Sequence, residues 1–134
     1  MYGHMLLNAT YRALQKVIPG RRPFIMARST FSGSGAYGGH WGGDNTSNWG
    51  SMYLAISQAL QFAIAGVPFF GPDTCGFDQN TDFELCSRWM AMSAFFPFYR
   101  NHNIKSTIPQ EAYRWAIVAA ASRNAMDVRY SMLP

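Results

Sequence analysis

The stretch Pro23-Phe24-Ile25-Met26-Ala27, followed at once by Arg28-Ser29-Thr30, decides the fold that we expect for this chain. A short, unbroken apolar run is typical of a strand that is buried on both faces of a parallel sheet. Pro19 and Gly20 end the segment before it, and a glycine-rich stretch comes after it. The sequence therefore predicts a buried strand whose carboxyl end carries Arg28.

Two more apolar runs end in polar residues in the same way. Val67-Pro68-Phe69-Phe70 is followed by Asp73-Thr74-Cys75-Gly76, and Phe95-Phe96-Pro97-Phe98-Tyr99 is followed by Arg100-Asn101-His102-Asn103. The proline inside the last run weakens its prediction as a strand. Because the carboxyl ends of barrel strands meet at one face, we expect the three polar clusters to converge on one pocket.

Apolar residues at helical spacing occupy the segments between these strands. The predicted helices cover Leu6–Val17, a segment up to Ile64 that Asn48 or Ser51 caps, a segment from the capping pattern Thr81-Asp82-Phe83-Glu84 to about Ser93, and most of Gln110–Met132. This alternation predicts a parallel α/β sheet with three strand–helix units. A (β/α)₈ TIM barrel has eight units in about 250 residues, so residues 1–134 would form one partial barrel domain. A complete, small doubly wound domain is the alternative.

The composition suggests that other polypeptide covers much of the chain surface. Only 13% of the 134 residues are charged, against about 25% in ordinary soluble domains. A small domain has a large surface to cover with polar groups, so we expect a fragment of a larger protein. Met1-Tyr2-Gly3-His4 is not a signal-peptide start, and no apolar run approaches the roughly 18 residues of a membrane span.

The charged and sulfur-containing residues narrow the range of partners. The net charge of +4 comes from basic residues scattered along the chain, which argues against nucleic-acid binding. His40, His102 and the two cysteines have no zinc-binding spacing, and we expect no metal or other cofactor. On these grounds alone, Cys75 and Cys86 form either one disulfide or two buried thiols.

A glycine-rich stretch follows the first predicted strand. Gly33-x-Gly35-x-x-Gly38 matches a dinucleotide-binding fingerprint, which would make the chain a nucleotide-binding α/β domain. That fingerprint opens directly into a helix, yet Trp41 and two more glycines intervene before any helical spacing begins. We therefore interpret the glycines as residues that let a long catalytic loop bend tightly.

The residues His40-Trp41-Gly42-Gly43-Asp44-Asn45 on this loop have the chemistry of a sugar site. Aromatic rings stack on the apolar faces of sugars, and carboxyl groups exchange protons with the glycosidic oxygen. Taken singly, Asp44 is a common turn or capping residue, and Arg28, Asp73 and His102 are ordinary structural partners. Their occurrence together at successive strand ends favours a carbohydrate-cleaving site.

Four motifs in this order resemble those of glycoside hydrolase family 31. They are 22–31 (RPFIMARSTF), 40–45 (HWGGDN), 71–77 (GPDTCGF) and 98–103 (FYRNHN). The resemblance covers nearly the whole chain and is to extracellular and lysosomal α-glucosidases and fungal maltase-glucoamylases. It implies a (β/α)₈ barrel and retaining hydrolysis of terminal α-linked glucose, with an α-glucoside oligosaccharide as substrate and the rest of the catalytic domain as partner.

The resemblance also assigns roles to individual residues. Asp44 matches the general acid/base of the family, which protonates the leaving oxygen and then activates water. The residues that match substrate-binding positions are Arg28, Trp41, Asp73, Phe77 and His102. Cys75 and Cys86 stand where the secreted relatives carry a disulfide, so the resemblance implies that they are paired.

One part of the family pattern is missing from this chain. The nucleophile of the family is an aspartate in a Trp-x-Asp-Met-Asn-Glu type of motif, which does not occur here. Retaining hydrolysis needs two carboxyl groups about 5–5.5 Å apart, and Asp73 is a poor substitute because the family uses it for binding. We therefore expect the fragment alone to be inactive. A non-catalytic carbohydrate-binding relative, an α-xylosidase and an α-glucan lyase are the alternative functions.

Two N-glycosylation sequons, Asn8-Ala9-Thr10 and Asn45-Thr46-Ser47, are typical of a protein of the secretory pathway. We therefore expect the parent protein to be secreted or to reside in the vacuole or lysosome. A glycan on Asn45 would crowd the pocket beside Asp44. The sequence thus predicts that Asn45 is unmodified.

Overall fold

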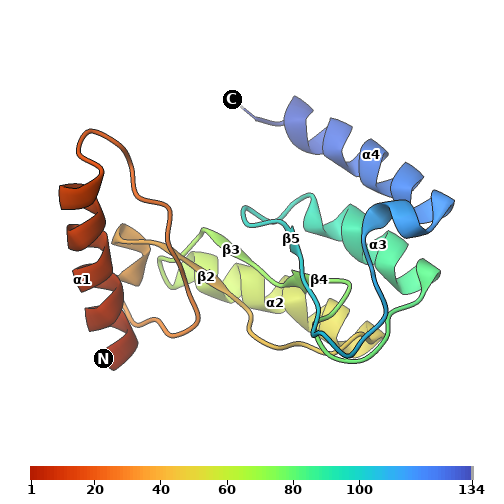
Figure 1. Cartoon of the computed structure of the whole chain (residues 1–134), viewed down its shortest axis with the longest axis horizontal. Coiled ribbons are helices and arrows are strands. Elements are labelled where there is room, and N and C mark those ends of the chain that lie inside the picture. Colours follow the sequence, from red (N-terminus) through yellow and green to blue (C-terminus); the bar gives the residue numbers. More distant parts are fainter. Residues whose placement is uncertain (134) are drawn as a thin grey trace.

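The structure is a computed structural model that describes residues 1–133. Its helices are α1 (Tyr2–Val17), α2 (Trp49–Ile64), α3 (Phe83–Ser93) and α4 (Ala116–Ser131), with short 3-10 helices η1 (Ser34–Ala36) and η2 (Ala112–Arg114). Its strands are β1 (Met26–Ala27), β2 (Gly39–Trp41), β3 (Phe70–Gly71), β4 (Asp73–Thr74) and β5 (Arg100–Asn101). Figure 1 shows α1 at one end of the chain and the α3–α4 pair at the other.

The strands lie side by side in the order in which they occur along the chain. β1, β2 and β3 form one parallel sheet in that order, and β4 pairs in parallel with β5. Pro72 separates β3 from β4 and has no N–H for a ladder. The N–H of Phe98, just before β5, donates to the carbonyl oxygen of Phe70 at 3.1 Å. The run 70–74 therefore joins β2 on one side to β5 on the other.

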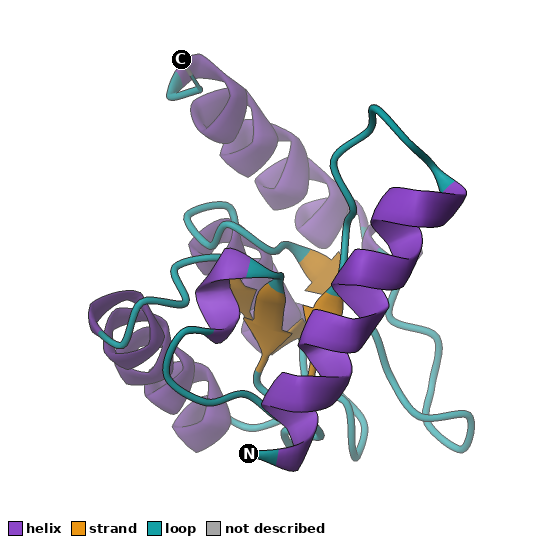
Figure 2. Ribbon diagram, turned by 90° about the vertical axis from the view of Figure 1, so that its left-hand side faces the viewer, coloured by secondary structure: helices purple, strands orange, loops and turns teal. Residues whose placement is uncertain are grey.

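This strand order is that of a barrel segment. In a doubly wound sheet the strand order reverses at a switch point, whereas the pairs described in residues 1–133 continue in one direction. Figure 2 shows strands in the middle of the molecule with helices around them, as in a (β/α)₈ barrel. The predicted fold class is confirmed, and the doubly wound alternative does not fit.

Strand β2 is absent from the sequence-based prediction, which places residues 39–41 in a loop. That placement is wrong because close backbone approach, rather than an apolar run, makes this strand. A Cβ on Gly39 would collide with the carbonyl oxygen of Phe69, and that oxygen accepts the N–H of His40 at 2.9 Å. Trp41 therefore lies at the carboxyl end of β2. Of the two candidate site residues in this motif, Trp41 and Asp44, only Asp44 lies on the loop after the strand.

The other predicted strands differ from the observed ones in their bounds. The run 23–27 contributes only Met26–Ala27. The run 67–70 contributes only Phe70, from which β3 continues into Gly71, and the run 95–99 contributes no strand residue. The guanidinium of Arg129 on α4 donates to three carbonyl oxygens between residues 94 and 97. These carbonyls are thus bonded to α4 at the turn after α3 and are not available to a neighbouring strand. The strand predicted over 95–99 begins instead at Arg100, as β5.

The glycines before β2 do not belong to a catalytic loop, so that interpretation is wrong. They precede β2 and therefore lie at the amino end of the strands, opposite the carboxyl ends. A Cβ on Gly38 would lie 2.7 Å from the carbonyl oxygen of Ile25, and one on Gly35 would collide with the carbonyl of Gly66. These glycines allow backbones to pack closely at the bottom of the barrel segment.

The core lies between α3, α4 and the turn after β4. The Cys75–Cys86 disulfide is present, as the resemblance implies. It packs with Leu85, Trp89, Met90 and Val118 in one buried cluster. Asp82, rather than Thr81, caps α3, because its Oδ1 accepts the N–H groups of Glu84 and Leu85 at 2.9 Å each. The disulfide and this cap fix α3 against the end of β4.

Helix α2 exposes an apolar face. Ile56, Leu60 and Ile64 follow helical spacing and are 45%, 62% and 89% exposed. An apolar stripe of this kind normally packs against other structure. No helix in the described part of the chain is both long and apolar enough to cross a membrane.

Replacing Gly71 by alanine is expected to destabilise the protein by about 3 kcal/mol or more. A Cβ at this position would collide with the backbone carbonyl of Phe98, which cannot move without breaking the junction with β5. Thermal unfolding and soluble yield are the measurements. Gly50→Ala, on exposed helix α2, is the matched control and should be neutral or stabilising. A Gly71→Ala protein with an unchanged unfolding temperature would contradict the strand junction.

Candidate active site

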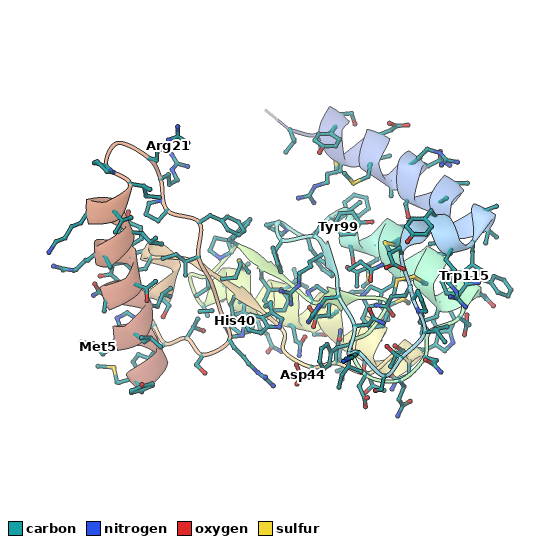
Figure 3. The ribbon with its side chains drawn as sticks, viewed as in Figure 1. Met5, Arg21, His40, Asp44, Tyr99 and Trp115 are labelled. Carbon is teal, nitrogen blue, oxygen red and sulfur yellow. A yellow bond between two sulfur atoms is a disulfide. The ribbon has the colours of Figure 1, made fainter. Side chains whose placement is uncertain are left out.

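Arg28 and Asp44 meet at the carboxyl ends of β1 and β2. Arg28 Nη2 lies 3.5 Å from Asp44 Oδ2, and the two side chains are 59% and 46% exposed. Gly43, at φ +75°, makes the turn between Trp41 and Asp44. Figure 3 shows Asp44 outside the strand region, while His40 lies inside it. An accessible carboxyl group is therefore held beside a guanidinium at the end of the strands.

Asp73 forms an ion pair across β4 and β5 with Arg100, whose side chain is partly exposed. The side chain of Asp73 is fully buried, and its Oδ1 accepts from Arg100 Nη2 at 2.5 Å. Burial raises the pKa of Asp73, while the hydrogen bond and charge of Arg100 oppose that shift. No donor among residues 1–133 reaches Oδ2. A direct contact between Asp73 and a sugar therefore stays a prediction.

The guanidinium of Arg100, which pairs with Asp73, also lies over two aromatic rings, those of Trp41 and Phe98. Its central carbon lies 5.4 Å from the centre of the Trp41 ring and 5.2 Å from that of Phe98. Cations are attracted to the faces of aromatic rings at such distances. One side chain from β5 thus contacts the end of β2 and the start of β4.

Phe77 and His102 lie together on the loops after β4 and β5. Their ring centroids are 5.2 Å apart and tilted by 37°. The N–H of Ile104 donates to the carbonyl oxygen of Phe77 at 2.9 Å, which ties the two loops together. The charges of His102 and Asp44 both act on the pKa of Asp73, in opposite directions. The predicted residues therefore come from four strand ends and gather at one edge.

Asn45 links the loop after β2, which carries Asp44, to β4 and the turn after it, which carry Asp73 and Phe77. Its Nδ2 donates to the carbonyl oxygen of Asp73 at 2.9 Å, and its Oδ1 accepts the N–H of Phe77 at 3.0 Å. The residue after Asp44 is thereby bonded to the turn that carries Phe77. Neither Asn45 nor Arg100 receives a site role from the sequence. Their only signal is their position beside predicted residues, in 40–45 and 100–103.

His40 has a structural role within the sheet. It is buried, its Nδ1 lies 3.0 Å from Thr30 Oγ1, and its ring stacks on Phe62 at 4.1 Å. Burial lowers the pKa of His40, which favours the neutral imidazole. This histidine supports the strand before Trp41 and does not belong to the exposed site.

Asn45 is expected to carry no glycan although it begins a sequon. Its Nδ2, the atom to which a glycan attaches, donates to the backbone of Asp73, and the buried hydroxyl of Ser47 donates to the carbonyl oxygen of Gln79 at 3.1 Å. Both essential side chains of the sequon are engaged in the fold. Glycopeptide mass analysis of the secreted protein checks this, and an occupied Asn45 in folded protein would contradict it.

The fold and site together define a segment of a (β/α)₈ barrel with a polar site at the carboxyl ends of its strands. The model of the glycosyl hydrolases family 31 TIM-barrel domain matches residues 1–134. The chain belongs to glycoside hydrolase family 31.

Individual relatives give the same assignment. The chain is 66% identical to an α-glucosidase of Aspergillus oryzae over 134 residues, all of this chain and 14% of the relative. The glucosidase II α subunit, in a Tris-bound structure, superposes on 98% of this chain and 15% of its own, with a TM-score of 0.91 and 40% identity. A family 31 α-glucosidase from Bacteroides thetaiotaomicron gives 0.94 over 99% of this chain and 23% of its own, at 36% identity. The chain therefore spans a small part of the proteins it resembles.

Proposed function

We propose that this chain is part of the catalytic barrel of a retaining α-glucosidase, which releases terminal glucose from α-linked oligosaccharides. The observation that carries the proposal is the meeting of the exposed carboxyl of Asp44 with Arg28, while Asn45 bonds to the turn that bears Phe77. A sugar site needs such a carboxyl group, hydrogen-bond donors and apolar rings in one place. The name α-glucosidase of the Aspergillus oryzae relative supports the choice of substrate.

In the proposed mechanism, Asp44 protonates the glycosidic oxygen as the leaving sugar departs. It then takes a proton from the water that completes hydrolysis. Arg28, which contacts Asp44, holds this carboxyl at the strand end and donates to a sugar hydroxyl with its remaining N–H groups. His102 donates a further hydrogen bond, while Trp41 and Phe77 lie against the apolar faces of the sugar.

The nucleophile of this mechanism is proposed to come from chain outside these 134 residues. Retaining enzymes place their two carboxyl groups about 5–5.5 Å apart. Asp73 does not suit the second role because it is fully buried and paired with Arg100. The exposed apolar stripe on α2 supports a larger barrel around this segment. We call the longer protein that contains this chain and completes the barrel the parent enzyme.

We propose that the parent enzyme belongs to the secretory pathway. The Cys75–Cys86 disulfide supports this location, because disulfides persist in oxidising compartments. The match to a structure titled as an ER glucosidase II heterodimeric complex is in keeping with it.

A panel of substrates tests the proposed activity. The parent enzyme is expected to release glucose from maltose, to leave the β-linked disaccharide cellobiose intact and to act poorly on an aryl α-xyloside. Accumulation of an unsaturated or anhydro sugar in place of glucose would indicate a lyase. A folded parent that binds maltose in calorimetry without cleaving it would be a carbohydrate-binding protein, and the proposal would be wrong.

A further inference from the structure

A buried glutamine, Gln110, lies where the loops after β4 and β5 meet. It belongs to the segment between β5 and η2, and only 1% of its surface is exposed. Its backbone carbonyl accepts Asn101 Nδ2 at 2.7 Å. A polar side chain this deeply buried is costly unless it is hydrogen-bonded. The amide nitrogen of Gln110 is bonded, whereas no donor among residues 1–133 reaches its Oε1.

The amide nitrogen of Gln110 is surrounded by oxygen atoms from both loops. Nε2 lies 2.9 Å from Asn101 Oδ1 and 3.0 Å from the carbonyl oxygen of Gly76. The carbonyl oxygens of Thr74 and His102 follow at 3.3 and 3.4 Å. Four acceptors around one amino group fix the orientation of the amide, because an oxygen there would face only oxygens.

The turn that Gln110 holds has an unusual backbone. Cys75 and Gly76 are consecutive residues with positive φ, +75° and +93°. A non-glycine residue in the left-handed region persists only where the surrounding structure enforces it. A Cβ on Gly76 would collide with Ser47, so this turn also packs tightly on its other side. Phe77 is the next residue, and its placement follows from this turn.

We propose that Gln110 is a positioning residue for the sugar subsite. Its carboxamide joins the carbonyl of Gly76 to that of His102, and so fixes Phe77 and His102 in the relative placement that binds the terminal sugar. The inference rests on the proposed function, since it takes these two rings as substrate contacts. Gln110 itself touches no substrate.

Two near-isosteric substitutions in the parent enzyme test the inference. Gln110→Met removes the donors, and Gln110→Glu puts an acceptor among four oxygens. Each is expected to raise KM for maltose about tenfold or more, because small displacements of binding groups have large kinetic effects. Val67→Ala, at a buried position beside Gly35 at the amino end of the strands, is the control for lost stability and should lower the thermal midpoint with KM unchanged.

The pH dependence of the Gln110→Glu variant gives a readout that a merely structural role does not predict. A carboxyl group buried among oxygens is protonated more readily, and the protonated form regains one donor. The KM of this variant, relative to wild type at each pH, should therefore fall as the pH is lowered. The other ionisable groups on the segments around position 110 include Asp73, Glu84, Arg88, Arg100, His102, Lys105, Glu111 and Arg114, all of which the wild-type reference retains.

A double-variant comparison decides whether Gln110 acts through His102. In a His102→Ala background, Gln110→Met should raise KM by much less than it does alone, because the positioned contact is already gone. A Gln110→Met enzyme with wild-type KM, or full additivity with His102→Ala, would overturn the inference. If the wild-type parent hydrolyses no α-glucoside, the proposed function fails, and maltose affinity by calorimetry then compares the same variants without turnover.

Discussion

Replacement of Asp44 by asparagine in the parent enzyme is expected to lower kcat on maltose by about 10²–10⁴-fold, the usual contribution of a general acid/base. Asparagine keeps the size of the side chain and can still lie beside Arg28, but it cannot transfer the proton. Because Asp44 is half exposed, the substitution should leave the thermal midpoint nearly unchanged. Steady-state kinetics and maltose binding are the measurements, and affinity should persist.

The choice of leaving group separates this role from a general loss of structure. α-Glucosyl fluoride has a leaving group that needs no proton, so its bond-breaking step should suffer far less in the Asp44→Asn enzyme than that of maltose. Asp127→Asn, which removes an exposed carboxyl on α4, is the matched control and should retain wild-type kinetics. Equal losses on both substrates would argue against proton transfer by Asp44.

Replacement of Arg100 by methionine is expected to destabilise the parent enzyme by about 3 kcal/mol at neutral pH. This is the low end of the range for breaking a buried pair, because Arg100 itself is 35% exposed. Asp73 is fully buried, and Arg100 is its hydrogen-bonded cation. Removal of Arg100 leaves a buried charge with little compensation and takes away the contact with Trp41. Thermal unfolding across a pH series measures the effect.

The sign of the pH dependence follows from the direction of the shift. Burial raises the pKa of Asp73, and the loss of Arg100 would raise it further. A group whose pKa is raised on folding opposes folding above its unfolded pKa, so the part of the penalty that comes from the Asp73 charge should grow as the pH rises and vanish in strong acid. Adding Asp73→Asn should restore stability without restoring activity. Arg88→Met breaks the exposed pair with Glu84 and should cost less than about 1 kcal/mol. A pH-independent Arg100→Met penalty would contradict the account.

The sequence predicts the helices better than the strands. The apolar period of α2 and the cap at Asn48 are confirmed, because its Oδ1 accepts the N–H of Ser51 at 2.8 Å. Strand β2 has no such signal, since it depends on the close approach of Gly39 to Phe69. Tertiary contacts of this kind leave no periodic pattern in a single sequence.

The candidate site shows the same division. Arg28, Asp73 and His102 stand just after predicted strands, where polar residues are visible in the sequence, whereas Trp41 and Asp44 belong to a strand end that the sequence does not predict. The residues that hold them, Asn45, Arg100 and Gln110, bond mostly to backbone carbonyls and to a buried carboxylate. Such bonds join residues 8 to 36 positions apart. Only the fold brings these partners together.

The most direct test of the account is glucose release from maltose by the Aspergillus oryzae relative in which this chain replaces the matching segment. At 66% identity over 134 residues, the exchange leaves about two thirds of the residues in this segment unchanged. We predict steady release of glucose from maltose and none from cellobiose. A folded exchange protein that binds maltose but releases no glucose would contradict the claim that these residues supply the acid/base and sugar contacts of an α-glucosidase.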